Sequence, residues 1–147
     1  MGEEPPEMPH KLLDALDGWN SVKSAELYGV STWGQGYFNV TEDGYVAVNL
    51  KNTDGTVSIR LCDIVDGLRD RGMGLPLLLR FSDLLGDRIR LLNEAFGKAI
   101  ADYDYQGCYR GVFPIKVNQQ QQAVHDVVTF GAPYHHGLEA GSKAELI

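Results

Sequence analysis

In the second half of the sequence, short apolar runs alternate with helical patterns, and this alternation constrains the fold more than any other feature. The run Leu75–Phe81 predicts a buried strand, and Ser82 is placed to cap the helix that follows. One face of that helix carries Leu85, Ile89, Leu92, Phe96 and Ile100. Further patterns predict a strand over 109–115, a helix over 120–130 and a strand over 134–140. We therefore predict an α/β fold with parallel strands.

The sequence ends on the pattern of a helix start. Ser142 and Glu145 form a capping box, in which the two side chains satisfy exposed amide groups at a helix N-terminus. The chain stops shortly afterwards, at Ile147. A (β/α)8 barrel typically needs about 250 residues, so only its first strands and helices fit here. We expect an incomplete barrel, truncated at the C-terminus inside a larger domain.

The first half of the sequence predicts a β-rich region. Tyr37–Val40 and Tyr45–Val48 flank an Asp-Gly pair, which is a strong hairpin signal, and Val57–Leu61 adds a third candidate strand. Helical patterns cover 11–26 and 62–71. The predicted domains are a disordered tail at 1–9, an N-terminal helix and hairpin region at 10–74, and the start of the barrel at 75–147.

Composition excludes several classes of protein. The net charge is -7 and the Lys and Arg residues are scattered, which argues against a nucleic-acid surface and gives no reason to expect binding to an anionic membrane. No apolar run is long enough to span a bilayer, and the acidic N-terminus is not a signal peptide. Cys62 and Cys108 fit neither a disulfide framework nor a metal site. We expect a soluble, cytoplasmic protein.

Lys116 is the residue whose position points to chemistry. It follows the predicted strand at 109–115 and precedes a helix, so it lies at the carboxyl end of a strand, where barrel enzymes place their active sites. Partial shielding from water would lower the pKa of its amine from about 10.4. A neutral amine can form a Schiff base with an aldehyde such as pyridoxal phosphate. The alternative is a solvated charge, which is what most lysines at strand ends are.

The segment Pro114-Ile-Lys-Val-Asn-Gln119 resembles the cofactor-lysine motif of biosynthetic arginine decarboxylases. These enzymes belong to a group with an alanine-racemase-like barrel that includes the ornithine and diaminopimelate decarboxylases. The resemblance extends from about Trp19 onward. The further segments that carry it, in order, are Trp33–Phe38, Leu75–Phe81, Arg88-Ile89, Asn93–Phe96 and Gly137–Leu146.

The resemblance implies a role for two residues. Lys116 corresponds to the catalytic lysine that binds pyridoxal phosphate. Glu139 corresponds to an acidic position on the second barrel strand, where its carboxylate would pair with that amine while the cofactor is bound to substrate; an ordinary ion pair at a strand end is the alternative. The implied reaction converts L-arginine to agmatine and carbon dioxide and feeds putrescine and spermidine synthesis. The resemblance alone also implies a Mg²⁺ requirement and a homo-oligomer.

Two alternatives stay open at this point. The chain is also consistent with a catalytically inactive truncated fragment or with a module that only pairs with another chain, and we expect the isolated chain to be inactive. A related decarboxylase acting on ornithine, lysine or diaminopimelate is the second alternative. No metal site is predicted, since His135 and His136 are neighbours on a predicted strand and point to opposite faces.

Overall fold

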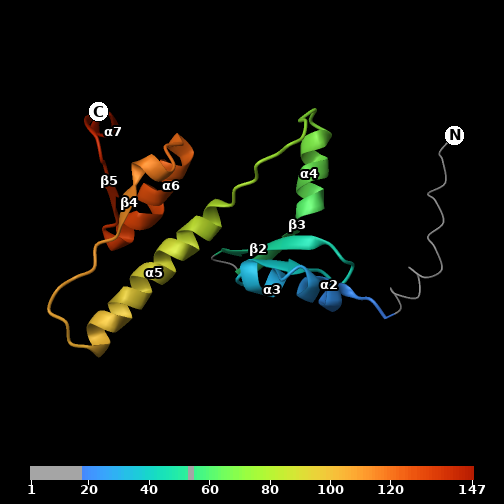
Figure 1. Ribbon diagram of the computed structural model, residues 1–147, viewed down its shortest axis with the longest axis horizontal. Helices are drawn as coiled ribbons and strands as arrows, with labels where there is room; N and C mark the ends of the chain where they lie inside the picture. Colours follow the sequence, from blue (N-terminus) through green and yellow to red (C-terminus); the bar gives the residue numbers. More distant parts are fainter. Residues whose placement is uncertain (1–17, 53–54) are drawn as a thin grey trace. The chain divides into compact units, whose positions relative to one another are not determined.

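The computed structural model describes residues 18–52 and 55–147 (Figure 1). The chain divides into two compact units, Met1–Leu77 and Leu78–Ile147. The tail predicted at 1–9 and the first part of the helix predicted over 11–26 lie outside the described residues.

The described part of the first unit begins with two short helices, α2 (Ser21–Leu27) and α3 (Val30–Trp33). The side chain of Asn20 caps α2 by accepting a hydrogen bond from the backbone amide of Lys23 at 3.0 Å. Gly29 separates the helices with a φ of 61°, a left-handed conformation that glycine adopts without steric cost. The described part of the helix predicted over 11–26 therefore corresponds to α2, whereas α3 lies beyond the predicted pattern.

A three-stranded antiparallel sheet follows, with the order β1-β2-β3. The strands are β1 (Phe38–Val40), β2 (Val46–Asn52) and β3 (Gly55–Arg60). The predicted hairpin and third strand are confirmed, with Val40 opposite Val46 beside the turn. The Thr41 hydroxyl closes this turn, accepting from the Tyr45 amide at 3.0 Å, and it also lowers the pKa of the Asp43 carboxyl.

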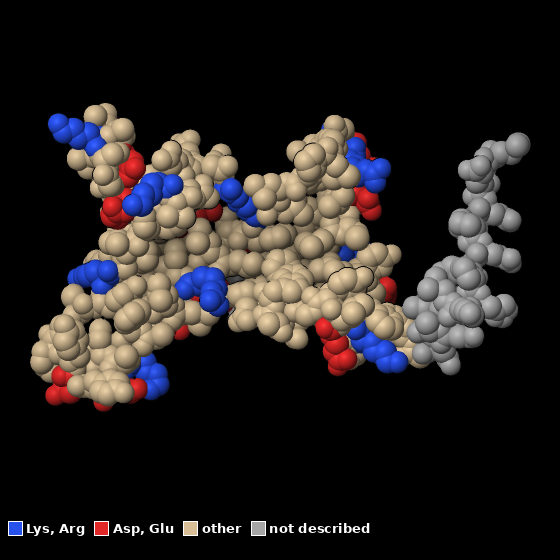
Figure 2. Space-filling model, viewed as in Figure 1, with Lys and Arg blue, Asp and Glu red and all other residues tan. Residues whose placement is uncertain are grey.

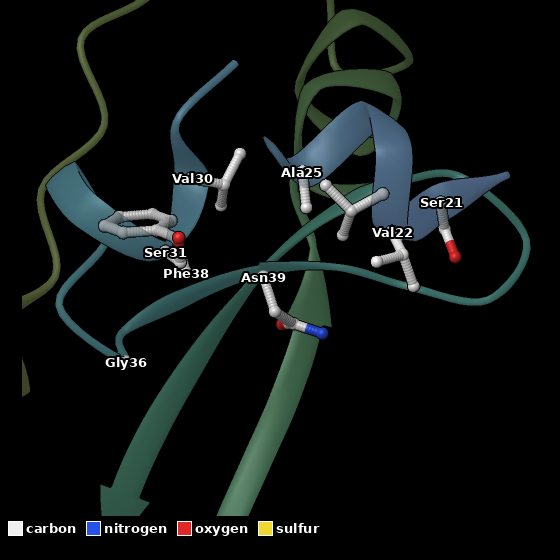
Figure 3. Close-up of a pocket in the computed structure, with 9 residues that line it drawn as sticks. Ser21, Val22, Ala25, Val30, Ser31, Gly36, Phe38 and Asn39 are labelled. Carbon is white, nitrogen blue, oxygen red and sulfur yellow. The ribbon is translucent and has the colours of Figure 1, made fainter. Parts of the chain in front are cut away.

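The core of the first unit lies where helices cover this sheet. Ala47 and Val48 of β2 are fully buried, and Val30 of α3 is almost so. Helix α4 (Leu61–Arg69), which confirms the predicted short helix, contacts β2 and β3. A cavity of about 430 Å³ remains beside α2, α3 and β1, and Figure 3 shows Val22, Ala25 and Val30 among its lining residues.

The second unit begins with the long helix α5 (Ser82–Asp102), which confirms the helix predicted from apolar spacing. The elements that follow are β4 (Val112–Pro114), the 3-10 turn η1 (Ile115–Val117), α6 (Gln121–Gly131), the 3-10 turn η2 (Ala132–Tyr134), β5 (Gly137–Glu139) and α7 (Lys143–Leu146). Strands β4 and β5 pair in parallel, with α6 between them in the chain. The α/β class is therefore confirmed, whereas the barrel itself stays a prediction.

The predicted buried strand at Leu75–Phe81 is wrong. The structure leaves this stretch without regular secondary structure, and the side chains of Leu75 and Leu78 are 66% and 77% exposed. An apolar run becomes a strand only if its backbone groups find a neighbouring strand, and Pro76 has no amide hydrogen to offer one. Ser82 is not a cap either: Phe81 holds the cap position, and Ser82 is the first helical residue.

Charged side chains lie in small separate groups on the face shown in Figure 2. Several are paired within one helix: Arg90 of α5 binds both Asp87 and Glu94, whose hydrogen bonds raise the pKa of Arg90. Lys98 binds Asp102 on the same helix. Such pairs on the surface of one helix stabilise it only weakly. Within the described ranges, no helix is long and apolar enough to cross a membrane.

Helices α5 and α6 meet closely at Gly86. A Cβ atom built on Gly86 would lie 3.0 Å from Cδ1 of Phe130, tighter than ordinary van der Waals contact. Gly97, on the same helix, has no atom within 4 Å of such a Cβ. The two glycines of α5 therefore differ in packing although they share one helical backbone.

We predict opposite effects for the same substitution at these glycines. Gly97→Ala should raise the free energy of unfolding by about 0.5–1 kcal/mol, because alanine favours the helix. Gly86→Ala gains the same propensity but displaces the Phe130 ring, an overpacking cost of about 1–3 kcal/mol, so it should lower stability. Urea unfolding followed by circular dichroism measures both. Equal stabilisation by the two variants would contradict the packing described here.

His136 fills the space between β4 and the end of α6. A Cβ atom on Gly111 would collide with the His136 ring, and one on Gly131 would lie 2.6 Å from the His136 Cβ. Within the described residues, the buried Nδ1 of His136 has no hydrogen-bond partner. The backbone amides of His136 and Gly137 donate to the carbonyls of Gly131 and Gly111, at 3.0 and 2.8 Å. The absence of side chains at Gly111 and Gly131 therefore leaves the space that the imidazole ring occupies.

Gly111→Ala should lower the free energy of unfolding by about 1–3 kcal/mol, the cost of overpacking, because the added methyl group would overlap the imidazole ring. His136→Ala removes the ring. In the His136→Ala variant, adding Gly111→Ala should lower the free energy of unfolding by much less. A double-mutant cycle on thermal unfolding measures the difference. If Gly111→Ala lowers the free energy of unfolding equally with and without the His136 ring, the clash with this ring is not the cause.

Candidate functional site

The candidate site is the edge of the second unit at which β4 and β5 end. Lys116 is the middle residue of η1, which follows β4 directly. In the parallel register, Pro114 lies opposite Glu139, the last residue of β5. Because parallel strands end at a common edge, the turn with Lys116 and the carboxylate of Glu139 belong to the same edge. The sequence-based prediction of a lysine at a strand's carboxyl end therefore describes the local structure correctly.

The predicted shielding of Lys116 is not found. Lys116 is an exposed residue, and none of the ion pairs among the described residues includes it. The physical reason is that η1 is a short turn beyond the end of a three-residue strand, where few neighbouring side chains cover it. An exposed primary amine can act as a nucleophile toward an aldehyde when it is unprotonated.

Glu139 is half-buried, and it lies beside a second carboxylate rather than in an ion pair with Lys116. A Cβ atom built on Gly141 would lie 3.4 Å from Oε1 of Glu139 and 3.6 Å from Oε2 of Glu145. The two carboxylates thus flank the turn after β5. The sequence could not predict this arrangement, because it depends on how the chain bends at Gly141.

Glu145 has a structural role, as the capping box predicts. Its Oε2 accepts a hydrogen bond from the amide of Gly141 at 2.7 Å, and its own amide donates to the Ser142 hydroxyl at 3.3 Å. The two side chains therefore satisfy backbone amides at the start of α7. This engagement holds Glu145 in place. Glu139 is the carboxylate of the edge that forms no hydrogen bond or ion pair among the described residues.

A chain of polar contacts leads away from Lys116 toward the helices. Asn118 ends η1, and its side-chain oxygen accepts from the amide of Gln120 at 3.1 Å. The side-chain oxygen of Gln120 in turn accepts a hydrogen bond from Arg80, just before α5. The hydroxyl of Ser82 donates to Oδ2 of Asp126 on α6 at 2.6 Å. Sequence reasoning missed Arg80, Gln120 and Asp126 because their partners lie about forty residues away.

The remaining candidates from the sequence do not form a site. His135 ends η2 in a left-handed conformation with a φ of 53°, and it is exposed, whereas the His136 ring is packed against glycines. The two histidines therefore do not lie together on a strand as predicted. In the part of the chain that is described, no group of three or more His, Cys, Asp or Glu residues could hold a metal ion.

Comparison with known proteins agrees with the motif at this edge. No family model matches the chain. It is 48% identical over 132 residues to the biosynthetic arginine decarboxylase of Gloeobacter violaceus and 51% identical over 129 residues to that of a Nostoc species. Biosynthetic arginine decarboxylase 1 of a Synechocystis species is 49% identical over 129 residues. These matches cover 88–90% of the chain and 18–20% of the relatives.

The chain thus spans about a fifth of the length of the curated relatives that it matches. The similarity runs through both units, because a match of 132 residues cannot fit within either one. The resemblance found in the sequence is confirmed: over about nine tenths of its length, the chain is homologous to a segment of the biosynthetic arginine decarboxylases.

Proposed function

We propose that the chain supplies the lysine edge of an arginine decarboxylase active site, in which Lys116 holds pyridoxal phosphate. The observation that carries the proposal is the homology to proteins named biosynthetic arginine decarboxylase, together with an amine and a carboxylate at one edge of β4 and β5. The reaction converts L-arginine to agmatine and carbon dioxide. Agmatine is a precursor of putrescine and spermidine, which is the pathway that the sequence resemblance implies.

The residues at this edge fit an aldehyde cofactor in one testable respect. Lys116 is exposed and takes part in no ion pair among the described residues, so its amine is sterically open to a ligand. When bound, the cofactor's ring supplies an electron sink for the bond that breaks during decarboxylation. Helix α6 begins shortly after Lys116, and helix N-termini attract phosphate groups.

The chain's own residues have separate roles in this proposal. Lys116 binds the cofactor through its amine and needs to lose a proton to do so. Glu139, at the same edge, is the carboxylate that would pair with this amine while the cofactor is bound to substrate. Glu145 is held by the capping box and acts only structurally. The Mg²⁺ requirement and the homo-oligomer stay predictions of the resemblance.

Arginine is favoured over ornithine, lysine and diaminopimelate as the substrate. The support is that relatives at 46–51% identity are named biosynthetic arginine decarboxylases. The edge of β4 and β5 offers no argument on this point, since an amine and a carboxylate serve all four substrates equally.

We expect pyridoxal phosphate to label Lys116 in preference to the other lysines. The purified chain is incubated with pyridoxal phosphate, reduced with borohydride and mapped by peptide mass spectrometry. Lys98 is bound by Asp102 and should react less. Lys143 is exposed like Lys116, but it lies on the four-residue helix α7, whose dipole is small. It is therefore the matched internal control.

A Lys116→Arg variant keeps the positive charge and removes the reactive amine, so it should lose the label at this position only. Equal labelling of Lys116 and Lys143 in the unaltered chain, or preferential labelling of any other lysine, would refute the assignment of Lys116.

We also expect the purified chain alone to release no carbon dioxide from labelled arginine. The relatives are about five times longer than the matched segment, and decarboxylation needs groups that bind the cofactor's phosphate and ring nitrogen as well as its aldehyde. Scintillation counting of trapped carbon dioxide measures this. Release above that of the Lys116→Arg chain would overturn the expectation and would make this chain an enzyme by itself.

A further inference from the structure

The turn that carries Lys116 has little secondary structure of its own. It consists of a single 3-10 turn, closed by a hydrogen bond from the amide of Asn118 to the carbonyl of Ile115 at 3.2 Å. One such bond does not fix the direction of a turn, since isolated 3-10 turns have poor hydrogen-bond geometry. The position of the Lys116 backbone therefore depends on what holds the residues after it.

Those residues are anchored in two steps. The side chain of Asn118 accepts from the amide of Gln120 at 3.1 Å, which forms a local turn of the kind that asparagine favours. The carbonyl of Gln120 accepts from the amide of Val124 at 3.0 Å and so starts α6. Gln120 is thus the residue at which the Lys116 turn joins a regular helix.

The Gln120 side chain does not cap α6 but reaches another element. Its Oε1 accepts a hydrogen bond from the Arg80 guanidinium, which comes from the stretch before α5. A hydrogen bond from a charged donor is stronger than a neutral one. Nearby, Ser82 donates to Asp126 at 2.6 Å, so two polar contacts join the same pair of segments. A cavity of about 350 Å³ lies there and is lined by Arg80, Ser82, Asn118 and Asp126 among others.

From these contacts we infer that Gln120, held by Arg80, is a positioning residue for Lys116. The inference rests on the proposed function, since it gives Gln120 a role only if Lys116 binds a cofactor. The Arg80 contact fixes Gln120, Gln120 fixes Asn118 through its amide, and Asn118 closes the turn with Lys116. Without the Arg80 contact, the Gln120 side chain loses its link to the stretch before α5, and the amine samples more directions.

The test compares three variants at neighbouring glutamines. Gln120→Leu removes the acceptor at similar size, and Gln120→Glu keeps an acceptor for Arg80. Gln121→Leu makes the same change at the exposed first residue of α6, whose side chain forms no hydrogen bond among the described residues. The readout is the rate of pyridoxal phosphate labelling at Lys116 divided by that at Lys143, after borohydride reduction and peptide mapping.

Gln120→Leu should lower this ratio about three- to tenfold, the range expected for one hydrogen bond. Gln120→Glu should retain the ratio, and so should Gln121→Leu. Arg80→Leu should reproduce the effect of Gln120→Leu. Circular dichroism confirms that each variant is folded, and a ratio taken within one chain cancels differences in protein concentration.

The outcomes separate the two proposals. If the unaltered chain shows no preference for Lys116, the proposed function fails. If the unaltered chain shows the preference, but Gln120→Leu and Gln121→Leu have the same labelling ratio, the positioning role of Gln120 is refuted. The assignment of Lys116 then stands. A loss in Gln120→Glu as large as in Gln120→Leu would also refute it, since the acceptor is still present there.

Discussion

The parallel pairing of β4 and β5 is the constraint on which the candidate site depends. Its register, with Pro114 opposite Glu139, brings an amine and a carboxylate from separate segments to one edge. The pair is short, so packing beside it must help to hold it. The His136 ring, seated between Gly111 and Gly131, provides such packing at the other end of the strands. The packing of His136 at one end of the strand pair therefore helps to keep Pro114 opposite Glu139 at the other end.

The exposure of Lys116 has a chemical consequence. Attack on an aldehyde requires the amine to be reachable as well as correctly placed. The described edge supplies both, because Lys116 follows β4 directly and its side chain is exposed. Position and access are therefore properties of this edge itself.

Local signals in the sequence predicted much of the fold. The Asp-Gly turn predicted the hairpin, apolar spacing predicted α5, and Ser142 with Glu145 predicted the start of α7. Each of these depends on residues a few positions apart, which a sequence pattern contains. The strand predicted at 75–81 is wrong for the opposite reason. Its apolar composition suits a strand, but a strand needs a partner from elsewhere in the chain.

The residues of the candidate site also differ in whether the sequence could predict them. Lys116 could be found from the sequence because its position after an apolar run is a local property. Gln120 could not, because its side-chain partner Arg80 lies forty residues earlier in the chain. The residues after Lys116 therefore make two separate contacts: the Asn118 amide closes the turn, and the Gln120 side chain binds Arg80 and anchors it. The turn sets where the amine leaves the backbone, and the anchor sets which way the turn faces.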